Sequence, residues 1–487
     1  MLLSSMLNNI HAMQVVGSPE LIEINKLSID SRENLEKAVF FAIKGFKVDG
    51  HKYIPQAVSN GAYAIVVDHD DKEINQLLSS NKIVKILVQD SRRALSQFAD
   101  SFYNSPSKKL NLVGITGTKG KTTVSYYVKT IFENSRRKSG LIGTNKNMIG
   151  SEEISTKLTT PEAHVINELM DKMVKAECTD CVMEVSSHAL ELSRVADLDF
   201  NVGVFTNITS DHLDFHSTFE NYLSAKKILF DQLGKESRVV FNKDDQNYEA
   251  LLKDCKASAV SYSFGNTADL EIKNVDYTLD GTSFSLIYKD NSYEVKTKLI
   301  GQFNAYNATA AIGASLSSGI SIEKSIDGIY NTPQVPGRFE VVSSGKKKVI
   351  IDYSHTADSL EQALKAIKHI VKNDREVYTV FGCGGDRDKT KRPVMGEIAE
   401  RLSDFTFVTS DNPRTENPMA IINEIIKGMS LQNHKVIEDR EEAIKSAIEQ
   451  SSNDAVILVA GKGHENYQEI NGIREYFSDR ETAQKYL

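Results

Sequence analysis

The chain has 487 residues, of which 40% are hydrophobic and 25% are charged, as in ordinary globular proteins with sizeable cores. A formal net charge of −8 argues against nucleic acid or an acidic membrane surface as the main partner. Four cysteines are too few for a disulfide framework, and the sequence has neither a long apolar run nor a positive segment before its first leucines. We expect a cytoplasmic protein of roughly three domains, without a membrane partner.

The first part of the chain, residues 1–108, contains short apolar runs that predict strands at 39–42, 64–67 and 83–88. Ser105 to Lys109, with a proline between two serines, is typical of a linker. We therefore predict that the first domain ends near residue 108.

A glycine-rich stretch, Gly114 to Thr123, organises the rest of the chain. The apolar run 110–113 predicts a buried strand before it, and the apolar spacing of 124–132 predicts an amphipathic helix after it. Such a turn offers backbone N–H groups to phosphate oxygens, while Lys121 adds a positive charge and Thr122 a hydroxyl for Mg²⁺. Ile115 replaces a glycine of the strict phosphate-loop pattern. We predict that this variant loop binds ATP or GTP, rather than forming a turn without nucleotide, through Gly117, Thr118, Lys119, Gly120, Lys121, Thr122 and Thr123.

Strands and helices alternate after this loop, which predicts an α/β fold with a mostly parallel sheet in a central domain over 109–335. Turn signals in 259–300 predict antiparallel hairpins there. A second boundary at Gln334 to Arg338 opens a C-terminal domain over 336–487, where the same alternation predicts a doubly wound α/β sheet. The strands expected in the two domains are 181–185, 202–206, 238–242, 348–351, 377–381, 405–409 and 455–460.

Several polar residues of the central domain lie directly after predicted strands. Glu184 ends one such strand and can reach Mg²⁺ held by the nucleotide, the alternative being a surface carboxylate. Ser186 follows it, with substrate binding and helix capping equally open. The acid and histidine cluster at 211–216 is a weak metal signal, and the pair Lys226 and Lys227 is by default solvated.

Cys178 and Cys181 form a C-x-x-C pair that no second pair completes into a zinc site. We therefore interpret them as two half-buried thiols beside a strand.

Three loops of the C-terminal domain, 382–387, 411–414 and 461–465, each follow a predicted strand. If the strands are parallel, these loops converge at one edge of the sheet. Arg387 and Arg414 would then suit a carboxylate, and Glu465 an ammonium group. The sequence predicts a site for a zwitterion, with a structural cluster of ion pairs as the alternative.

The ordered motifs along the chain are Asp30-Ser31-Arg32, 114–123, Thr159-Thr160-Pro161, 184–188, Asn207 with 211–216, Lys226, 301–304, 337–340, 352–355 and the three C-terminal loops. Together they resemble the Mur ligases, ATP-dependent amino-acid-adding enzymes of peptidoglycan precursor synthesis, over nearly the whole chain. Asp411-Asn412-Pro413-Arg414 resembles the form associated with meso-diaminopimelate rather than lysine. The resemblance implies a cytoplasmic ligase that serves cell-wall synthesis, cell shape and cell division.

The resemblance also implies ATP and Mg²⁺ as cofactors, and the UDP-N-acetylmuramoyl-L-alanyl-D-glutamate dipeptide and meso-diaminopimelate as substrates. We expect a monomer. ATP would phosphorylate the D-glutamate γ-carboxylate, and the amine of diaminopimelate would attack the acyl phosphate. The rivals are a folylpolyglutamate-synthase-like ligase, which should lack the N-terminal domain, and a non-enzymatic nucleotide switch.

Residue roles carried over by the resemblance fall into four groups. The UDP-sugar dipeptide would be held by Ser31, Thr159, Thr160, Ser186 and Arg194, and ATP by the loop with Asn304, Arg338 and Asp352. Metal binding and catalysis would involve Lys121, Thr122, Glu184, His212 and a carbamylated Lys226. Diaminopimelate would be bound by Arg387, Asp411, Asn412, Pro413, Arg414, Gly461 and Glu465.

Overall fold

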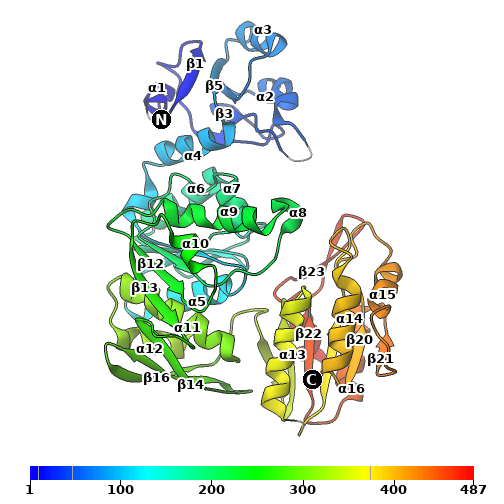
Figure 1. Cartoon of the computed structure of the whole chain (residues 1–487). Helices are drawn as coiled ribbons and strands as arrows, with labels where there is room; N and C mark the ends of the chain where they lie inside the picture. Colours follow the sequence, from blue (N-terminus) through cyan, green and yellow to red (C-terminus); the bar gives the residue numbers. More distant parts are fainter. Residues whose placement is uncertain (9, 46–47, 373) are drawn as a thin grey trace. The chain divides into compact units, whose positions relative to one another are not determined.

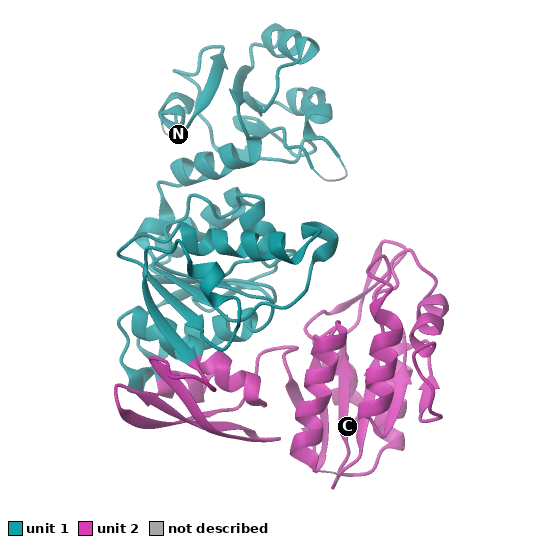
Figure 2. Cartoon of the chain, in the orientation of Figure 1, with its two compact units in different colours: residues 1–262, 310–325 teal, residues 263–309, 326–487 magenta. Residues whose placement is uncertain are grey.

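The computed structural model describes residues 1–8, 10–45, 48–372 and 374–487 (Figure 1). Residues 1–262 with 310–325 form one compact unit, and residues 263–309 with 326–487 form a second (Figure 2). Each of the three predicted domain ranges contains strands of its own, and the domain boundaries stay a prediction. No helix among the described residues is long and apolar enough to cross a membrane.

The N-terminal sheet of the first unit has the strand order β1-β5-β4-β3-β2, in which only β1 is antiparallel to its neighbour. Buried apolar side chains cover both of its faces, so that it has a core on each side. The three predicted strands are present. The elements are α1 (Leu3–Leu7), β1 (Ala12–Val16), β2 (Lys26–Ser28), β3 (Ala38–Phe41), α2 (Ile54–Ser59), β4 (Ala64–Val67), α3 (Lys72–Ser80), β5 (Val84–Val88) and α4 (Ser91–Phe102).

The predicted linker at 105–109 forms a packed 3₁₀ turn, Pro106–Lys109, and its role as a domain boundary stays a prediction. Pro106 and Ser107 are buried, and the Ser107 hydroxyl accepts a hydrogen bond from the backbone N–H of Asp199 at 3.2 Å. The proline and serine pattern therefore marked a turn correctly, and the hydrogen bond with Asp199 fixes that turn against the region of the central sheet.

The central sheet of the first unit runs β13-β12-β11-β6-β10-β7-β8-β9, with parallel pairing from β13 to β7. The first strand after the linker extends to Thr116, beyond the predicted end at 113, because residues 113–116 pair with β11 and residues 111–115 with β10. The elements are β6 (Asn111–Thr116), α5 (Lys121–Asn134), β7 (Ser139–Ile142), β8 (Asn147–Ile149), β9 (Glu152–Ile154), α6 (Ala163–Lys175), β10 (Asp180–Glu184), α7 (Ser187–Glu191), β11 (Val202–Phe205), α8 (Leu213–His216), α9 (Phe219–Asp231), β12 (Arg238–Asn242), α10 (Tyr248–Leu252) and β13 (Ser258–Ser263). Two further helices, α11 (Gln302–Ser317) and α12 (Ile322–Asn331), are each divided between the two units.

The second unit begins with the antiparallel strands β14 (Leu270–Thr278), β15 (Gly281–Tyr288) and β16 (Asn291–Thr297). They confirm the predicted hairpins, and burial alternates along most of β15. Residues 258–263 are different, because they form β13 and pair parallel with β12.

The C-terminal sheet runs β17-β18-β22-β19-β20-β21, with only β17 antiparallel. Successive residues of β22 belong to separate cores, Leu458 to one and Ile457 to the other, so the sheet is covered on both faces. This confirms a doubly wound α/β domain. The elements are β17 (Glu340–Ser344), β18 (Lys347–Asp352), α13 (Ala357–Val371), β19 (Val377–Phe381), α14 (Lys391–Leu402), β20 (Phe405–Val408), α15 (Pro418–Ile426), β21 (His434–Val436), α16 (Arg440–Gln450), β22 (Val456–Ala460), β23 (Tyr467–Ile470), β24 (Ile473–Tyr476) and α17 (Asp479–Tyr486).

Candidate active site

The glycine-rich loop connects β6, in the middle of the parallel sheet, to the first turn of α5. Gly117 has a φ of +149°, and a Cβ there would lie 2.0 Å from the Thr206 hydroxyl, so the close approach requires glycine. Asn207 holds the loop: its side-chain oxygen accepts from the Lys119 N–H at 3.0 Å, and its carbonyl accepts from the Thr118 N–H at 2.8 Å. The loop is thus fixed from the end of the neighbouring strand β11.

The Lys121 ammonium folds back over the loop and donates to the carbonyls of Gly117 at 2.8 Å and Thr118 at 3.0 Å. It therefore lies over the turn whose N–H groups can receive phosphate oxygens. The helix α5 begins at this lysine, which adds the positive end of the helix dipole to the same position.

Glu184 is 1% exposed, so the alternative of a surface carboxylate is wrong. Its carboxylate accepts hydrogen bonds of 2.9 Å from the Thr122 hydroxyl, the Thr144 N–H and the Thr144 hydroxyl. Carboxylate and hydroxyl oxygens are the ligands that Mg²⁺ prefers, so Thr122 and Glu184 together suit that ion.

A second group of residues adjoins the same strand end. The Thr160 hydroxyl donates to the carbonyl of Glu184 at 2.8 Å and lies 3.3 Å from the Ser186 hydroxyl, and Thr159 contacts Thr144 at 3.1 Å. The Ser186 hydroxyl also caps α7 by accepting from the Ala189 N–H, so the capping role exists whatever else this serine binds.

Arg194 joins this group by donating to the Thr160 carbonyl at 3.0 Å, and it pairs with Glu162 at 2.7 Å. Ser31 belongs to the N-terminal sheet region, where its hydroxyl donates to Gln56 at 2.7 Å. Four of the five residues expected at the sugar dipeptide therefore cluster, and Ser31 makes separate contacts.

Lys226 is 1% exposed, so the default of a solvated lysine is wrong for it. Its amine donates to the Gly117 carbonyl at 3.0 Å and lies 4.6 Å from the centre of the Tyr222 ring. Burial, and then the neighbouring Lys121 charge, lower the pKa of Lys226 well below its usual value, although Asp211 opposes this. The neighbouring Lys227 pairs with Asp254 at 2.7 Å near the surface.

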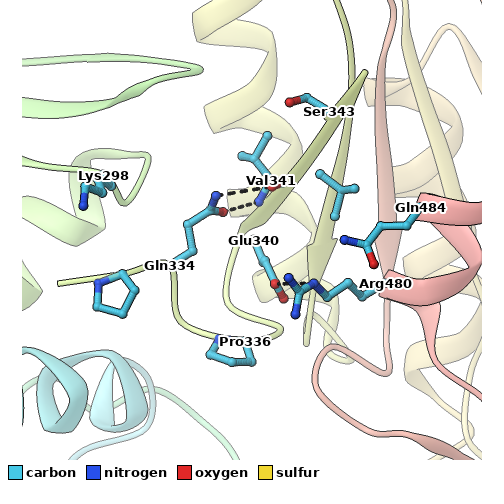
Figure 3. A pocket seen from close by; sticks show the side chains of 10 residues that line it. Lys298, Gln334, Pro336, Glu340, Val341, Ser343, Arg480 and Gln484 are labelled. Carbon is cyan, nitrogen blue, oxygen red and sulfur yellow. Dashed lines mark hydrogen bonds and ion pairs between the residues drawn. The ribbon is translucent and has the colours of Figure 1, made fainter. Parts of the chain in front are cut away.

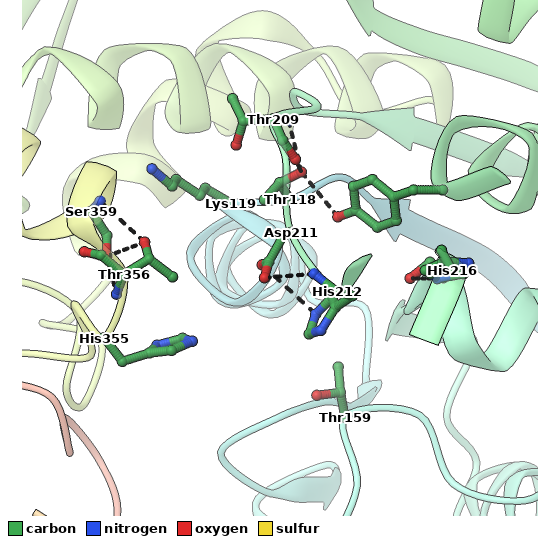
Figure 4. Close-up of polar contacts among 12 residues, drawn as sticks. Thr118, Lys119, Thr159, Thr209, Asp211, His212, His216, His355, Thr356 and Ser359 are labelled. Carbon is green, nitrogen blue, oxygen red and sulfur yellow. Dashed lines mark hydrogen bonds and ion pairs between the residues drawn. The ribbon is translucent and has the colours of Figure 1, made fainter. Parts of the chain in front are cut away.

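Three histidines gather beside this lysine, where the acid and histidine cluster was a weak signal. The His188 ring centre lies 5.0 Å from that of His212 and 5.5 Å from that of His216. Burial lowers the pKa of His188 to about 4 and lowers the pKa of His212. The Asp211 carboxylate accepts a hydrogen bond from the backbone N–H of His212 at 2.9 Å (Figure 4). Burial favours the neutral form of the histidine rings, which is the form that binds metals.

The loops after β19, β20 and β22 come from adjacent parallel strands, which confirms that they share one edge of the C-terminal sheet. Asn412 connects two of them, because it donates to Glu465 at 2.8 Å and accepts from Lys462 at 3.0 Å. Arg414 reaches the third loop by donating to the Gly385 carbonyl at 2.7 Å. Burial raises the pKa of Glu465, although the charge of Lys462 and the hydrogen bond from Asn412 both act to lower that pKa.

The other predicted residues of these loops lie close by. Asp411 and Pro413 are buried beside Asn412, a Cβ at Gly461 would lie 2.4 Å from Asp411 Oδ2, and Arg387 is exposed to solvent. A guanidinium at Arg387 and a carboxylate at Glu465, on loops that share one sheet edge, are compatible with a site for a zwitterion.

Asn304, Arg338 and Asp352 lie in the second unit, whereas the phosphate loop lies in the first, so their contact with one nucleotide stays a prediction. Asn304 donates to the Ile300 carbonyl at 2.9 Å. The Arg338 guanidinium stacks 4.7 Å from the Tyr353 ring centre, and Asp352 accepts from the Phe339 N–H at 2.7 Å.

A cavity of about 520 Å³ lies beside the segment that carries Arg338 (Figure 3). Glu340 in its wall accepts from the Gly337 N–H at 2.9 Å and pairs with Arg480 at 3.1 Å. None of the predicted site residues lines this cavity, so it is distinct from the candidate site.

Sequence reasoning assigned no role to two residues that shape the site, Thr144 and Asn207. Thr144 makes two hydrogen bonds to Glu184, and Asn207 fixes the phosphate loop. Each lies two residues beyond the end of a strand of the central sheet, β7 for Thr144 and β11 for Asn207, and that position is the signal that could have given each of them a role. The thiols of Cys178 and Cys181 are free, and burial raises their pKa. Both are fully buried rather than half-buried as predicted, and Cys181 lies within β10 itself.

Comparisons with known proteins show that the chain matches one protein family along most of its length. The profile of the Mur ligase family catalytic domain matches residues 23–103, that of the Mur ligase middle domain residues 115–315, and that of the Mur ligase glutamate ligase domain residues 337–463. The UDP-N-acetylmuramoyl-L-alanyl-D-glutamate--2,6-diaminopimelate ligase 1 of Clostridium acetobutylicum is 45% identical over 469 residues, which are 96% of this chain and 95% of that protein.

Solved structures are similar over the whole length as well. One of a UDP-N-acetylmuramoyl-L-alanyl-D-glutamate--2,6-diaminopimelate ligase has a TM-score of 0.71 and 31% identity, and the alignment covers 99% of this chain and 98% of that one. The MurF ligase of Thermotoga maritima in complex with ADP has a TM-score of 0.64 at 18% identity, with 96% and 97% covered, and shows likeness of fold.

Proposed function

We propose that this chain, which belongs to the Mur ligase family, is the ATP-dependent ligase that adds meso-2,6-diaminopimelate to UDP-N-acetylmuramoyl-L-alanyl-D-glutamate in peptidoglycan precursor synthesis. The reaction forms an amide bond. ATP first phosphorylates the D-glutamate γ-carboxylate, and the amine of diaminopimelate then displaces phosphate from the acyl phosphate. Phosphorylation is needed because a free carboxylate is a poor electrophile.

The observation that carries this proposal is the junction at the end of β10. There Glu184 is bonded through its side chain to Thr122 of the phosphate loop, and through its carbonyl to Thr160. A nucleotide in the loop and an acceptor held by Thr160 and Ser186 would meet at this strand end. That proximity is what phosphoryl transfer to a carboxylate requires.

Thr122, Glu184 and His212 would hold Mg²⁺, which would offset the charge of the phosphates. Lys121 acts on the same charge from the protein side. Lys226 is proposed to carry a carbamate, whose oxygens would replace its amine near Gly117. The lowered pKa of Lys226 supports this, because only the neutral amine reacts with carbon dioxide.

The C-terminal loops are proposed to bind diaminopimelate, with Arg387 and Arg414 on a carboxylate and Glu465 on an ammonium group. The folylpolyglutamate-synthase-like rival is disfavoured, because the family profile over residues 23–103 covers the N-terminal domain that such a ligase should lack. A non-enzymatic nucleotide switch is disfavoured because it would need no amino-acid site, and so would give the three C-terminal loops no function.

The test is release of ADP with purified chain, ATP, Mg²⁺ and the UDP-sugar dipeptide, with either meso-diaminopimelate or L-lysine added. We expect ADP release only when diaminopimelate is present, with the tripeptide product identified by mass. Equal turnover with lysine, or ADP release that no amino acid stimulates, would contradict the proposal.

A further inference from the structure

Arg392 is a fully buried arginine near the C-terminal loops to which the proposed reaction gives no role. It lies in the first turn of α14 and is 0% exposed. Its guanidinium makes a bidentate pair with Glu416, at 3.0 Å to Oε2 and 2.9 Å to Oε1, and a third contact of 2.7 Å to Glu424. Burying such a group costs free energy, which these contacts with the two glutamates offset.

The contacts of Glu416 join two of the three loops. Its Oε1 accepts from Arg392 and also from the backbone N–H of Asp386 at 2.6 Å. Asp386 directly precedes Arg387, and Glu416 comes two residues after Arg414. One carboxylate therefore connects the turns that carry both proposed carboxylate-binding arginines.

Further hydrogen bonds join the same two turns, and in these the donor lies in the turn of Arg414 and the acceptor is Asp386. The Asp386 carboxylate accepts from the Thr415 N–H at 3.2 Å and from the Thr415 hydroxyl at 2.8 Å. Arg392 also donates to the Gly384 carbonyl at 3.3 Å, so it touches the first turn directly as well as through Glu416. These contacts form a closed network around the base of the two turns.

The backbone at both turns is held in a costly conformation. Asp386 has a φ of +53° and Arg414 a φ of +52°, in the left-handed region that residues other than glycine rarely adopt. Such conformations persist where the surroundings over-determine them, and they concentrate at ligand-binding sites. The network of Arg392 and Glu416 is the surrounding that holds these two residues.

We propose that Arg392 is a positioning residue, which through Glu416 sets the spacing between the turn of Arg387 and the turn of Arg414. This inference rests on the proposed function. It names the residues that set how Arg387 and Arg414 are placed to bind a carboxylate of the incoming amino acid. Arg392 itself touches no substrate in this arrangement. Its effect on the reaction is confined to the site for the amino acid.

The experiment compares Arg392→Lys and Glu416→Gln with the native chain. The lysine keeps a positive charge but loses the bidentate geometry, and the glutamine keeps the shape but removes the charge of the pair. Arg401→Gln is the matched control, because Arg401 lies on the same helix and pairs with Glu397 at 2.7 Å and Glu361 at 3.2 Å, away from the loops. KM and kcat are measured for diaminopimelate, ATP and the UDP-sugar dipeptide, and folding is followed by circular dichroism.

We expect the KM for diaminopimelate to rise about tenfold or more in both variants, since small displacements of positioning groups carry costs of this size. The KM values for ATP and the dipeptide should stay within about twofold of native, a split that general loss of stability would not produce. Arg401→Gln should match the native chain in all three. An unchanged KM for diaminopimelate in a folded variant, or an equal rise for all three substrates, would overturn the inference.

A milder variant covers the case in which Arg392→Lys does not fold. Thr415→Val removes one hydrogen bond to Asp386 at an exposed position, and it should raise the KM for diaminopimelate alone. Native chain without diaminopimelate-dependent ADP release would overturn the proposed function and this inference together. Native activity with unaffected variants would overturn the inference alone.

Discussion

Replacement of Lys226 by methionine should abolish ligation while leaving the fold intact. Relative to the chain without the carbamate, the change removes one hydrogen bond to the Gly117 carbonyl, worth about 1 kcal/mol. That carbonyl keeps the 2.8 Å bond from Lys121, so no buried acceptor is left without a partner. Methionine is apolar, so the replacement also removes the free-energy cost of burying an amine, and this stabilising effect opposes the loss of the hydrogen bond. We therefore expect the midpoint of thermal unfolding to move by only about 2–4 °C.

The effect on activity should be much larger than this effect on stability. A preorganised group that acts on developing charge commonly contributes a factor of about 10²–10³ in kcat. A carbamate at Lys226 would be such a group, and its loss should lower ADP release by at least this factor. The smaller Lys226→Ala leaves space in which added short carboxylates can bind, so partial rescue is expected for alanine and not for methionine.

The carbamate itself can be observed by carbon-13 NMR in labelled bicarbonate. The native chain should show a carbamate signal that both Lys226 variants lack, and Lys227→Ala should keep it, because Lys227 pairs with Asp254 near the surface. Near-native turnover in Lys226→Met, or an active native chain without a carbamate signal, would refute the reasoning.

Four further predictions concern the phosphates and the amino acid. Lys121→Ala should lower kcat by about 10²-fold or more with little change in thermal stability, as measured by ADP release and calorimetry, and near-normal turnover would contradict the assignment. Native chain should prefer diaminopimelate over lysine by up to about 10⁴-fold, because a guanidinium without an anionic partner is penalised. Arg414→Ala should reduce this preference while the KM for ATP stays unchanged, and a preserved preference would count against the role of Arg414. Because burial raises the pKa of Glu465, its carboxylate takes up a proton at a higher pH than an ordinary glutamate. The KM for diaminopimelate should therefore rise as the pH falls towards this raised pKa, and Glu465→Gln should flatten that dependence; an unchanged pH profile in this variant would argue against a contact with the ammonium group.

Much of the fold followed from local pattern. Apolar runs bounded by turn residues located β3, β4, β12 and β19 almost to the residue, because a buried strand needs an unbroken apolar segment of that length. Turn signals indicated the antiparallel hairpins that contain β15, where burial alternates because the pleat of a half-buried strand has a period of two. The phosphate loop was equally evident, because it lies within one turn between a strand and a helix.

Burial of single charged residues depended on tertiary structure. Lys226 and Lys227 are adjacent and chemically identical in the sequence, yet one lies under the phosphate loop and the other pairs with acids near the surface. Successive helical residues point about 100° apart, so only the packing of α9 decides which of the two is enclosed. The same holds for Arg392, whose partners are 24 and 32 residues away along the chain.

The sequence alone determined the order of the strands along the chain, the phosphate loop and the residue types available at each strand end. The tertiary structure decided which of those ends became neighbours. It brought Thr144 to Glu184 and Asn207 to the loop, and it joined the turns of Arg387 and Arg414 through a single carboxylate. The physical reason is that hydrogen bonds between distant segments depend on strand order within a sheet, and that order is a property of the packed chain rather than of any local stretch.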